Sequence, residues 1–111
     1  MKAYAMTLNL INAVDKIEKY IKYHQAVWPE VERSLKSIGI IRMKIFLKGR
    51  RLFMYIETID NFNPEKDFPK YLEHDPKCKE WDSLMCKFQE KVPEATEKEW
   101  WTTMDEVYNL A

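Results

Sequence analysis

Apolar residues between positions 14 and 38 recur at alternating intervals of three and four. The series is Val14, Ile17, Ile21, His24, Trp28, Val31, Leu35 and Ile38. This spacing predicts one face of an amphipathic helix, and because charged residues fill the other side, the face should pack inward. The helix should begin near Ala13 and end before Gly39. Pro29 should either kink it near Trp28 or restart it from its own first turn.

The remaining pattern predicts a sheet and a second helix. Residues 3–10 alternate, and two apolar runs, 40–47 and 51–59, flank "KGR", which predicts a hairpin with Gly49 in its turn. A turn-rich segment, 60–69, has room for a short helical piece before a helix at 76–90, and residues 99–110 can supply a fourth strand. The order β-α-β-β-α-β predicts an α+β, ferredoxin-like antiparallel sheet with helices on one face, in one domain spanning residues 1–111.

Both faces of the predicted strand at 51–59 are apolar. Leu52, Met54 and Ile56 point to one side, and Phe53 and Tyr55 point to the other. One layer of helices covers only one face, and an antiparallel sheet usually leaves its other face polar. The same sheet of a second subunit is the economical cover, so we expect a homodimer.

Composition and charge exclude several classes of partner. Eighteen basic residues balance eighteen acidic ones in 111 residues, so the basic footprint of a nucleic-acid-binding protein is missing. No apolar run approaches the ~20 residues of a membrane span, and the N-terminus does not resemble a secretory signal. We therefore expect a cytoplasmic protein with no nucleic-acid or membrane partner. Cys78 and Cys86 should stay reduced, and His74 with Cys78 could supply only half a metal site, so we expect no metal.

His24 is the main candidate for a catalytic residue, and it lies on the apolar face one turn after Tyr20. Buried polar groups cost free energy unless they are paired, so His24 is either a hydrogen-bonded core residue or a group with a chemical task. An imidazole with an ordinary pKa near 6.5 can take and give a proton near neutrality. The four tryptophans, at 28, 81, 100 and 101, suit either packing or stacking on sugar rings. No phosphate loop or nucleophile elbow competes.

Several motifs together resemble the L-rhamnose mutarotase family. They are the string Y-x-x-x-H-x-x-x-WPE at residues 20–30, then "LKSIGI" and the hairpin, then "CKEWDSLM", and finally "EVYNL". The likeness covers nearly the whole chain. It implies a ferredoxin-like subunit in a dimeric α/β barrel, and an isomerase without a cofactor that interconverts the α and β anomers of a 6-deoxy sugar.

Matched by position to that family, His24 is the acid, Tyr20 contacts the substrate, and Trp81 is the first of two tryptophans. Asp82 stands in place of the second tryptophan, and Met43 in place of a tyrosine on the second strand. The resemblance therefore places these five residues at the sugar, which is L-rhamnose or a relative such as L-fucose. The second proton-transfer group is open between water and Asp82. Two alternatives stay open: a cofactor-independent monooxygenase, which shares the architecture, and a noncatalytic sugar-binding module in which His24 is structural.

Overall fold

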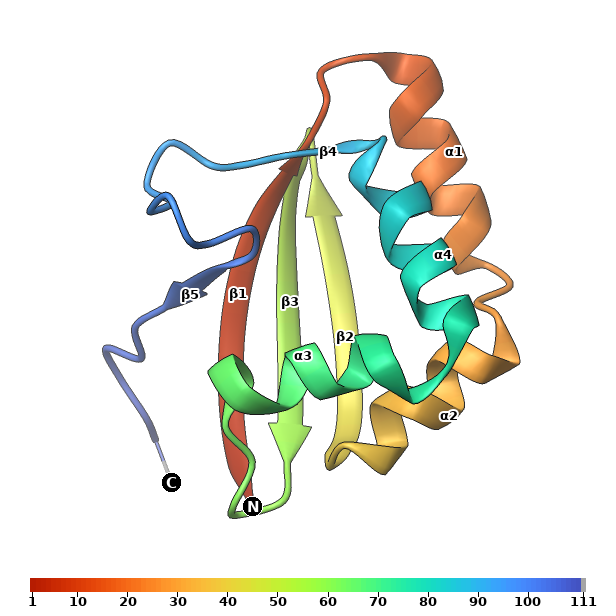
Figure 1. The fold of residues 1–111 in the computed structure, drawn as a ribbon. Helices are drawn as coiled ribbons and strands as arrows, with labels where there is room; N and C mark the ends of the chain where they lie inside the picture. Colours follow the sequence, from red (N-terminus) through yellow and green to blue (C-terminus); the bar gives the residue numbers. More distant parts are fainter. Residues whose placement is uncertain (111) are drawn as a thin grey trace.

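An antiparallel sheet with helices on one face forms the body of the molecule in the computed structural model, which describes residues 1–110 (Figure 1). The strands lie in the order β2 (Ile40–Lys48), β3 (Arg51–Thr58), β1 (Lys2–Leu10) and β4 (Gln89–Glu90), and the short β5 (Thr102–Met104) also pairs with β1. The helices are α1 (Val14–His24), α2 (Pro29–Ser37), α3 (Pro64–His74) and α4 (Pro76–Cys86). The predicted ferredoxin-like layering is confirmed. In this single chain the sheet is open, so a barrel would require a second subunit.

The predicted first helix is two helices, α1 and α2, because the chain restarts at Pro29. Trp28 is the extended residue before α2, and Pro29 occupies its first turn, where a missing N–H costs nothing. Gly39 follows α2 with a φ of +108°, a conformation that favours glycine. The break places His24 at the last residue of α1.

The second half of the chain differs from the sequence prediction in two places. Helix α3 is a full eleven residues, because the Asn63 side chain accepts hydrogen bonds from the amides of Glu65 and Lys66 and so caps its start. The helix predicted at 76–90 ends at Cys86, and Gln89 pairs with Leu10 as part of β4. Ending the helix there lets the chain return to the sheet.

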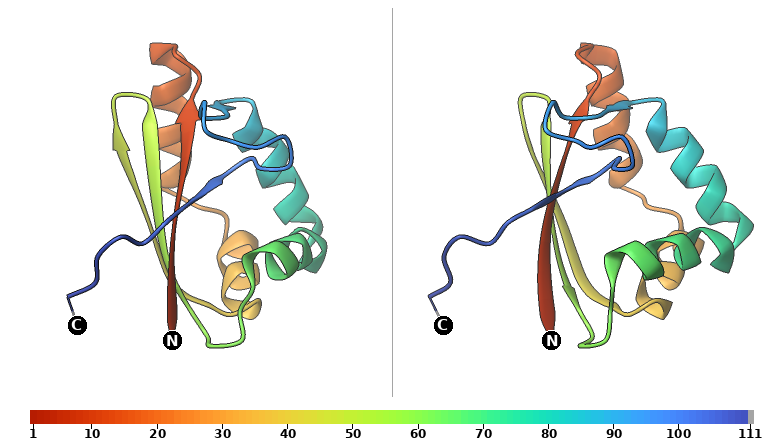
Figure 2. Two further views of the ribbon diagram at one scale, coloured as in Figure 1. Left: turned by 90° about the vertical axis from the view of Figure 1, so that its left-hand side faces the viewer. Right: turned by 60° about the vertical axis from the view of Figure 1, so that its left-hand side comes forward.

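The predicted fourth strand at 99–110 is also shorter than expected. Only Thr102–Met104 pairs with β1, opposite Ala5–Thr7. The segment beyond it leaves the body past β1, on the side away from the helices (Figure 2). Its apolar side chains Val107, Tyr108 and Leu110 are 94 %, 75 % and 86 % exposed.

The core lies between the sheet and the helices. Leu8, Leu10 and Leu52 pack in one cluster with residues of α1, α2 and α4, and Met54 and Ile56 pack in a second cluster with Phe62. The other face of the sheet carries Phe46, Phe53 and Tyr55, and the first two rings stack with centroids 5.9 Å apart. The two faces of β3 therefore carry the two sets of side chains that the sequence predicts.

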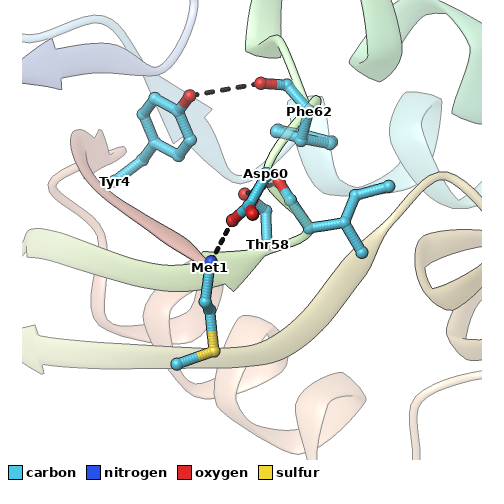
Figure 3. A network of polar contacts seen from close by, with 6 residues as sticks. Met1, Tyr4, Thr58, Asp60 and Phe62 are labelled. Atoms are coloured by element: carbon cyan, nitrogen blue, oxygen red, sulfur yellow. Dashed lines mark hydrogen bonds and ion pairs between the residues drawn. The ribbon is translucent and has the colours of Figure 1, made fainter.

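A polar network holds the connection between β3 and α3 (Figure 3). The Tyr4 hydroxyl donates to the Phe62 carbonyl at 3.2 Å, and the Met1 amino group contacts the Asp60 carboxylate. Thr58 donates to the Ile59 carbonyl at 3.0 Å. None of the helices in residues 1–110 has the length and apolar character needed to cross a membrane.

Candidate active site

Helix α1 brings Tyr20 and His24 into direct contact. They are four residues apart on one face, and their ring centroids are 4.2 Å apart. The His24 Nδ1 atom lies 2.9 Å from the Tyr20 backbone carbonyl oxygen. Because a carbonyl only accepts hydrogen bonds, Nδ1 carries the hydrogen, and Nε2 of the neutral ring keeps a lone pair. His24 therefore offers Nε2 as a proton acceptor.

A small hollow lies beside these two rings, between α1 and the sheet. It has a volume of about 180 Å³ and is lined by Tyr20, Ile21, His24, Gln25, Ile45, Leu47 and Leu52. The hollow is partly open to solvent, so a small molecule can enter it. Helix α1 supplies the polar side of the hollow, and β2 and β3 supply an apolar wall.

Burial sets the ionisation of both rings. It lowers the pKa of His24 below the usual 6.5, and the hydrogen bond to the Tyr20 carbonyl opposes this only in part. Burial raises the pKa of Tyr20 to about 12, and a hydrogen bond with the Gln89 side chain opposes that rise. At neutral pH the site therefore holds a neutral imidazole that can accept a proton and a phenol that keeps its own.

Trp81 reaches the same place from α4. Its ring centroid is 5.4 Å from that of His24 and 5.1 Å from that of Trp28, both edge-on. The side chain is only 7 % exposed. Trp81 thus contacts His24, but most of its surface is covered by protein.

Met43 and Asp82 have other neighbours. Met43 packs against the second core cluster and pairs with Ile56 across β2 and β3. Asp82 follows Trp81 on α4, and burial raises the pKa of its carboxyl group. On the same side of α4, burial raises the pKa of the Cys86 thiol, and the negative charge of Asp82 raises it further. The structure therefore gathers Tyr20, His24 and Trp81, and it places Met43 and Asp82 against different groups.

Two residues at this site carry no local signal in the sequence. Gln89 is buried in β4, where its side chain opposes part of the rise in the Tyr20 pKa, while Trp100 donates from Nε1 to the Gln89 Oε1 atom at 2.8 Å. Gln89 lies within the stretch that the sequence predicts as helix, so its pairing with Leu10 could not be foreseen. The positions of Ile45 and Leu52, which line the hollow, can by contrast be predicted, because strand alternation places both side chains on the face of the sheet that the helices cover.

The arrangement suits acid–base chemistry on a small hydroxylated molecule. An acceptor nitrogen and a phenol stand opposite an apolar wall. Within residues 1–110, no three His, Cys, Asp or Glu side chains gather closely enough to hold a metal ion.

Comparison with known proteins gives consistent results. Residues 3–110 match the model of a family described as L-rhamnose mutarotase. A UPF0734 protein of Dictyostelium discoideum is 53 % identical over 112 residues, which cover 98 % of this chain and 90 % of the relative. An L-fucose mutarotase of Xanthomonas campestris is 29 % identical over 113 residues, which cover 100 % of this chain and 90 % of the relative.

Solved structures share the fold. The crystal structure of an L-rhamnose mutarotase from Formosa agariphila superposes with a TM-score of 0.73 at 18 % identity, covering 100 % of both chains. A dimeric ferredoxin-like protein from an uncultured marine organism gives a TM-score of 0.57 at 16 % identity, covering 98 % of this chain and 91 % of the other.

Proposed function

The chain belongs to the L-rhamnose mutarotase family, and we propose that it is a sugar mutarotase that interconverts the α and β anomers of a 6-deoxy sugar such as L-rhamnose or L-fucose. One observation about this chain's own residues supports the proposal. His24 lines a hollow that a small molecule can enter, with Nδ1 held by a backbone carbonyl and Nε2 left as the acceptor. The imidazole is neutral at physiological pH because burial lowers its pKa.

In the proposed mechanism, His24 moves one proton between two oxygens of the sugar. Nε2 takes the proton of the anomeric hydroxyl, O1, and returns it to the ring oxygen, O5, as the C1–O5 bond breaks and the aldehyde forms. Both oxygens are bonded to C1, so a single nitrogen can reach each of them. The aldehyde turns about the C1–C2 bond, and the reverse steps close the ring as the other anomer. Positioned acid–base groups of this kind contribute about 10² to 10⁴ in rate.

The apolar wall of the hollow favours a 6-deoxy sugar. Ile45, Leu47 and Leu52 can cover the C6 methyl group, and burying a methyl-sized group contributes about 0.8 kcal/mol. A C6 hydroxyl in the same place would lose its water, at about 1–3 kcal/mol if it found no partner. L-rhamnose and L-fucose should therefore react faster than L-mannose and L-galactose, which differ from them only by that hydroxyl.

Anomer exchange followed by NMR saturation transfer tests the proposal. We expect the protein to accelerate exchange between the anomeric protons of L-rhamnose or L-fucose and to act more weakly on the two 6-hydroxy counterparts. Absence of acceleration on the whole panel, with the protein folded by circular dichroism, would overturn it. Binding without acceleration would instead identify a sugar-binding module.

We also propose that the protein is a cytoplasmic homodimer. The outer face of the sheet carries Phe46, which is 54 % exposed, and the apolar segment around Val107 has no cover in one chain. The likeness to a dimeric ferredoxin-like protein supports the dimer, and the free thiols of Cys78 and Cys86 support the cytoplasmic location.

Sedimentation velocity at micromolar concentration tests the dimer. Phe46→Glu should shift the protein toward a monomer, because it puts a charge on the face that the partner would cover. Lys66→Glu, on the exposed surface of α3, is the control and should leave the dimer intact. A native protein that sediments as a monomer would refute the assembly.

A further inference from the structure

A second cavity lies between α1 and the end of α4, and we call it the lysine groove. It has a volume of about 660 Å³ and is partly open to solvent. No residue that lines it also lines the hollow beside His24. Clefts that bind small molecules usually have volumes of about 300–1,000 Å³, so the groove has room for a ligand well beyond the size of a single ion. Its walls include Lys16, Lys19, Lys22 and Lys87, together with Tyr23 and Phe88.

The four lysines give the groove a positive charge that the protein does not balance. Lys16, Lys19 and Lys22 follow one another at intervals of three along α1, and Lys87 comes directly after the last residue of α4. No carboxylate lines the groove, the acidic residues of α1 included. Within residues 1–110, none of the four ammonium groups forms an ion pair. The positive charge is therefore concentrated here although the whole chain has no net charge.

The ordinary explanation for such lysines is a solvated helix surface. The lysines of other helices lie beside carboxylates instead: Lys70 pairs with Asp67 on α3 at 3.5 Å, and Lys77 pairs with Glu80 on α4 at 3.2 Å. Like charges one turn apart destabilise a helix, and the groove lysines of α1 have that spacing. An anion bound among them would remove this repulsion.

An aromatic ring forms another part of the groove. Tyr23 is 37 % exposed and lies one turn after Lys19. Its ring centroid is 5.9 Å from that of Phe88 and 6.3 Å from that of Trp81, which it meets edge-on. Two neighbouring rings thus hold Tyr23 in place, and its exposed part is a surface on which a flat ring can stack.

The charge and the ring together indicate the class of ligand. We propose that the lysine groove binds an organic polyphosphate that carries a flat ring, the chemistry of a nucleoside di- or triphosphate. The phosphates lie on the lysines and the ring lies against Tyr23. Lysine binds phosphate as a point charge, and the three lysines of α1 extend over about 9 Å of the helix, so a row of phosphates can engage more than one of them. This ligand is separate from the sugar, and the inference does not depend on the mutarotase function.

An NMR titration of the native protein with ATP, tripolyphosphate and adenosine tests the site. Amide chemical shifts report both the affinity and the place of binding. The titration is run at about 0.15 M salt, because long-range attraction between exposed charges is screened there. We expect ATP to bind more tightly than tripolyphosphate, which lacks the ring, and than adenosine, which lacks the charge. The shifts should change at residues 16–26 and 84–88.

A pair of double variants separates the groove from general charge. Lys19→Gln with Lys22→Gln removes two of the four lysines and should weaken ATP binding about tenfold or more, the usual effect of losing hydrogen bonds to a charged group. Lys36→Gln with Lys66→Gln is the matched control. It removes the same charge from the exposed surfaces of α2 and α3 and should bind ATP as the native protein does.

Tyr23→Leu tests the ring. The leucine side chain keeps an apolar contact with Phe88 but offers no flat surface for stacking. ATP affinity should fall to that of tripolyphosphate, and the affinity for tripolyphosphate should stay at the native value. Circular dichroism checks that each variant is folded.

The results divide clearly. Weaker ATP binding in the groove variants with an unaffected control would support the proposal. No saturable binding of ATP by the native protein, or equal losses in the two double variants, would overturn the site. Equal affinity for ATP and tripolyphosphate, unchanged in Tyr23→Leu, would overturn the assignment of a ring-bearing ligand. A hexaglutamate peptide that binds at the same amides more tightly than ATP would overturn it in favour of an acidic protein partner.

Discussion

Trp81→Ala should damage folding more than it weakens sugar binding, because the structure buries the ring that the family resemblance assigns to the sugar. The indole is 7 % exposed and meets His24, Trp28 and Tyr23 edge-on, with ring centroids 5.1 to 6.3 Å apart. Removing a buried tryptophan costs about 3–5 kcal/mol, and edge contacts of this kind account for about 0.5–1.5 kcal/mol each. That loss is a large part of the ~5–15 kcal/mol by which a domain is stable.

Urea unfolding followed by circular dichroism measures this cost. At a slope of about 1–3 kcal/mol per molar urea, the midpoint should fall by at least about 1 M. Sugar affinity of the folded fraction, measured by NMR titration, should change by less than about threefold. Trp81→Phe is the matched variant, since it keeps an aromatic ring and should recover much of the stability. A loss of stability below about 1 kcal/mol together with a tenfold weaker affinity would instead identify the ring as a surface that stacks on the sugar.

Two further predictions concern pH and the glycines. Exchange should be constant above neutrality and fall below pH 6.5 as His24 becomes charged, because burial lowers its pKa; a rate that rises on acidification would contradict a neutral imidazole. The free energy of unfolding should also decrease on acidification, because the unfolded chain binds the His24 proton at a higher pH than the folded chain does. The stabilisation from His24 is complete above pH 6.5 and is lost as the pH falls toward the folded pKa. Gly49→Ala should cost about 1–2 kcal/mol for its positive φ. Gly39→Ala should lower stability more than Gly49→Ala in thermal unfolding, because a Cβ at Gly39 would lie 2.7 Å from Ile59 Cγ1. Equal losses of stability in the two variants would show that the Ile59 side chain moves away.

The first half of the fold was accessible from the sequence because its signals are local. The three-and-four spacing located α1 and α2 and placed Tyr20 and His24 on one inward face, and Gly49 marked the hairpin. The second half depends on pairing between distant residues. Gln89 leaves its helical pattern because Leu10 offers it a strand partner, and the side chain then meets Trp100, eleven residues away.

The same limit applies to the candidate site. Residues on α1 were predictable from their spacing, whereas the positions of Met43 and Asp82 depend on how whole elements pack. Met43 pairs with Ile56 across two strands, and Asp82 lies on the side of α4 that carries Cys86. Their assignment to the sugar therefore stays a prediction, which alanine variants of each can test by their KM.

Anomer exchange measured side by side for the native protein and His24→Gln tests whether His24 moves the proton in catalysis. Glutamine keeps hydrogen-bonding capacity but cannot shuttle a proton in this pH range. Saturation transfer on L-fucose and L-rhamnose should show strong acceleration by the native protein and a loss of about a hundredfold or more in the variant, with its circular dichroism spectrum unchanged. Exchange by His24→Gln at the native rate would show that the imidazole is structural and moves no proton in catalysis.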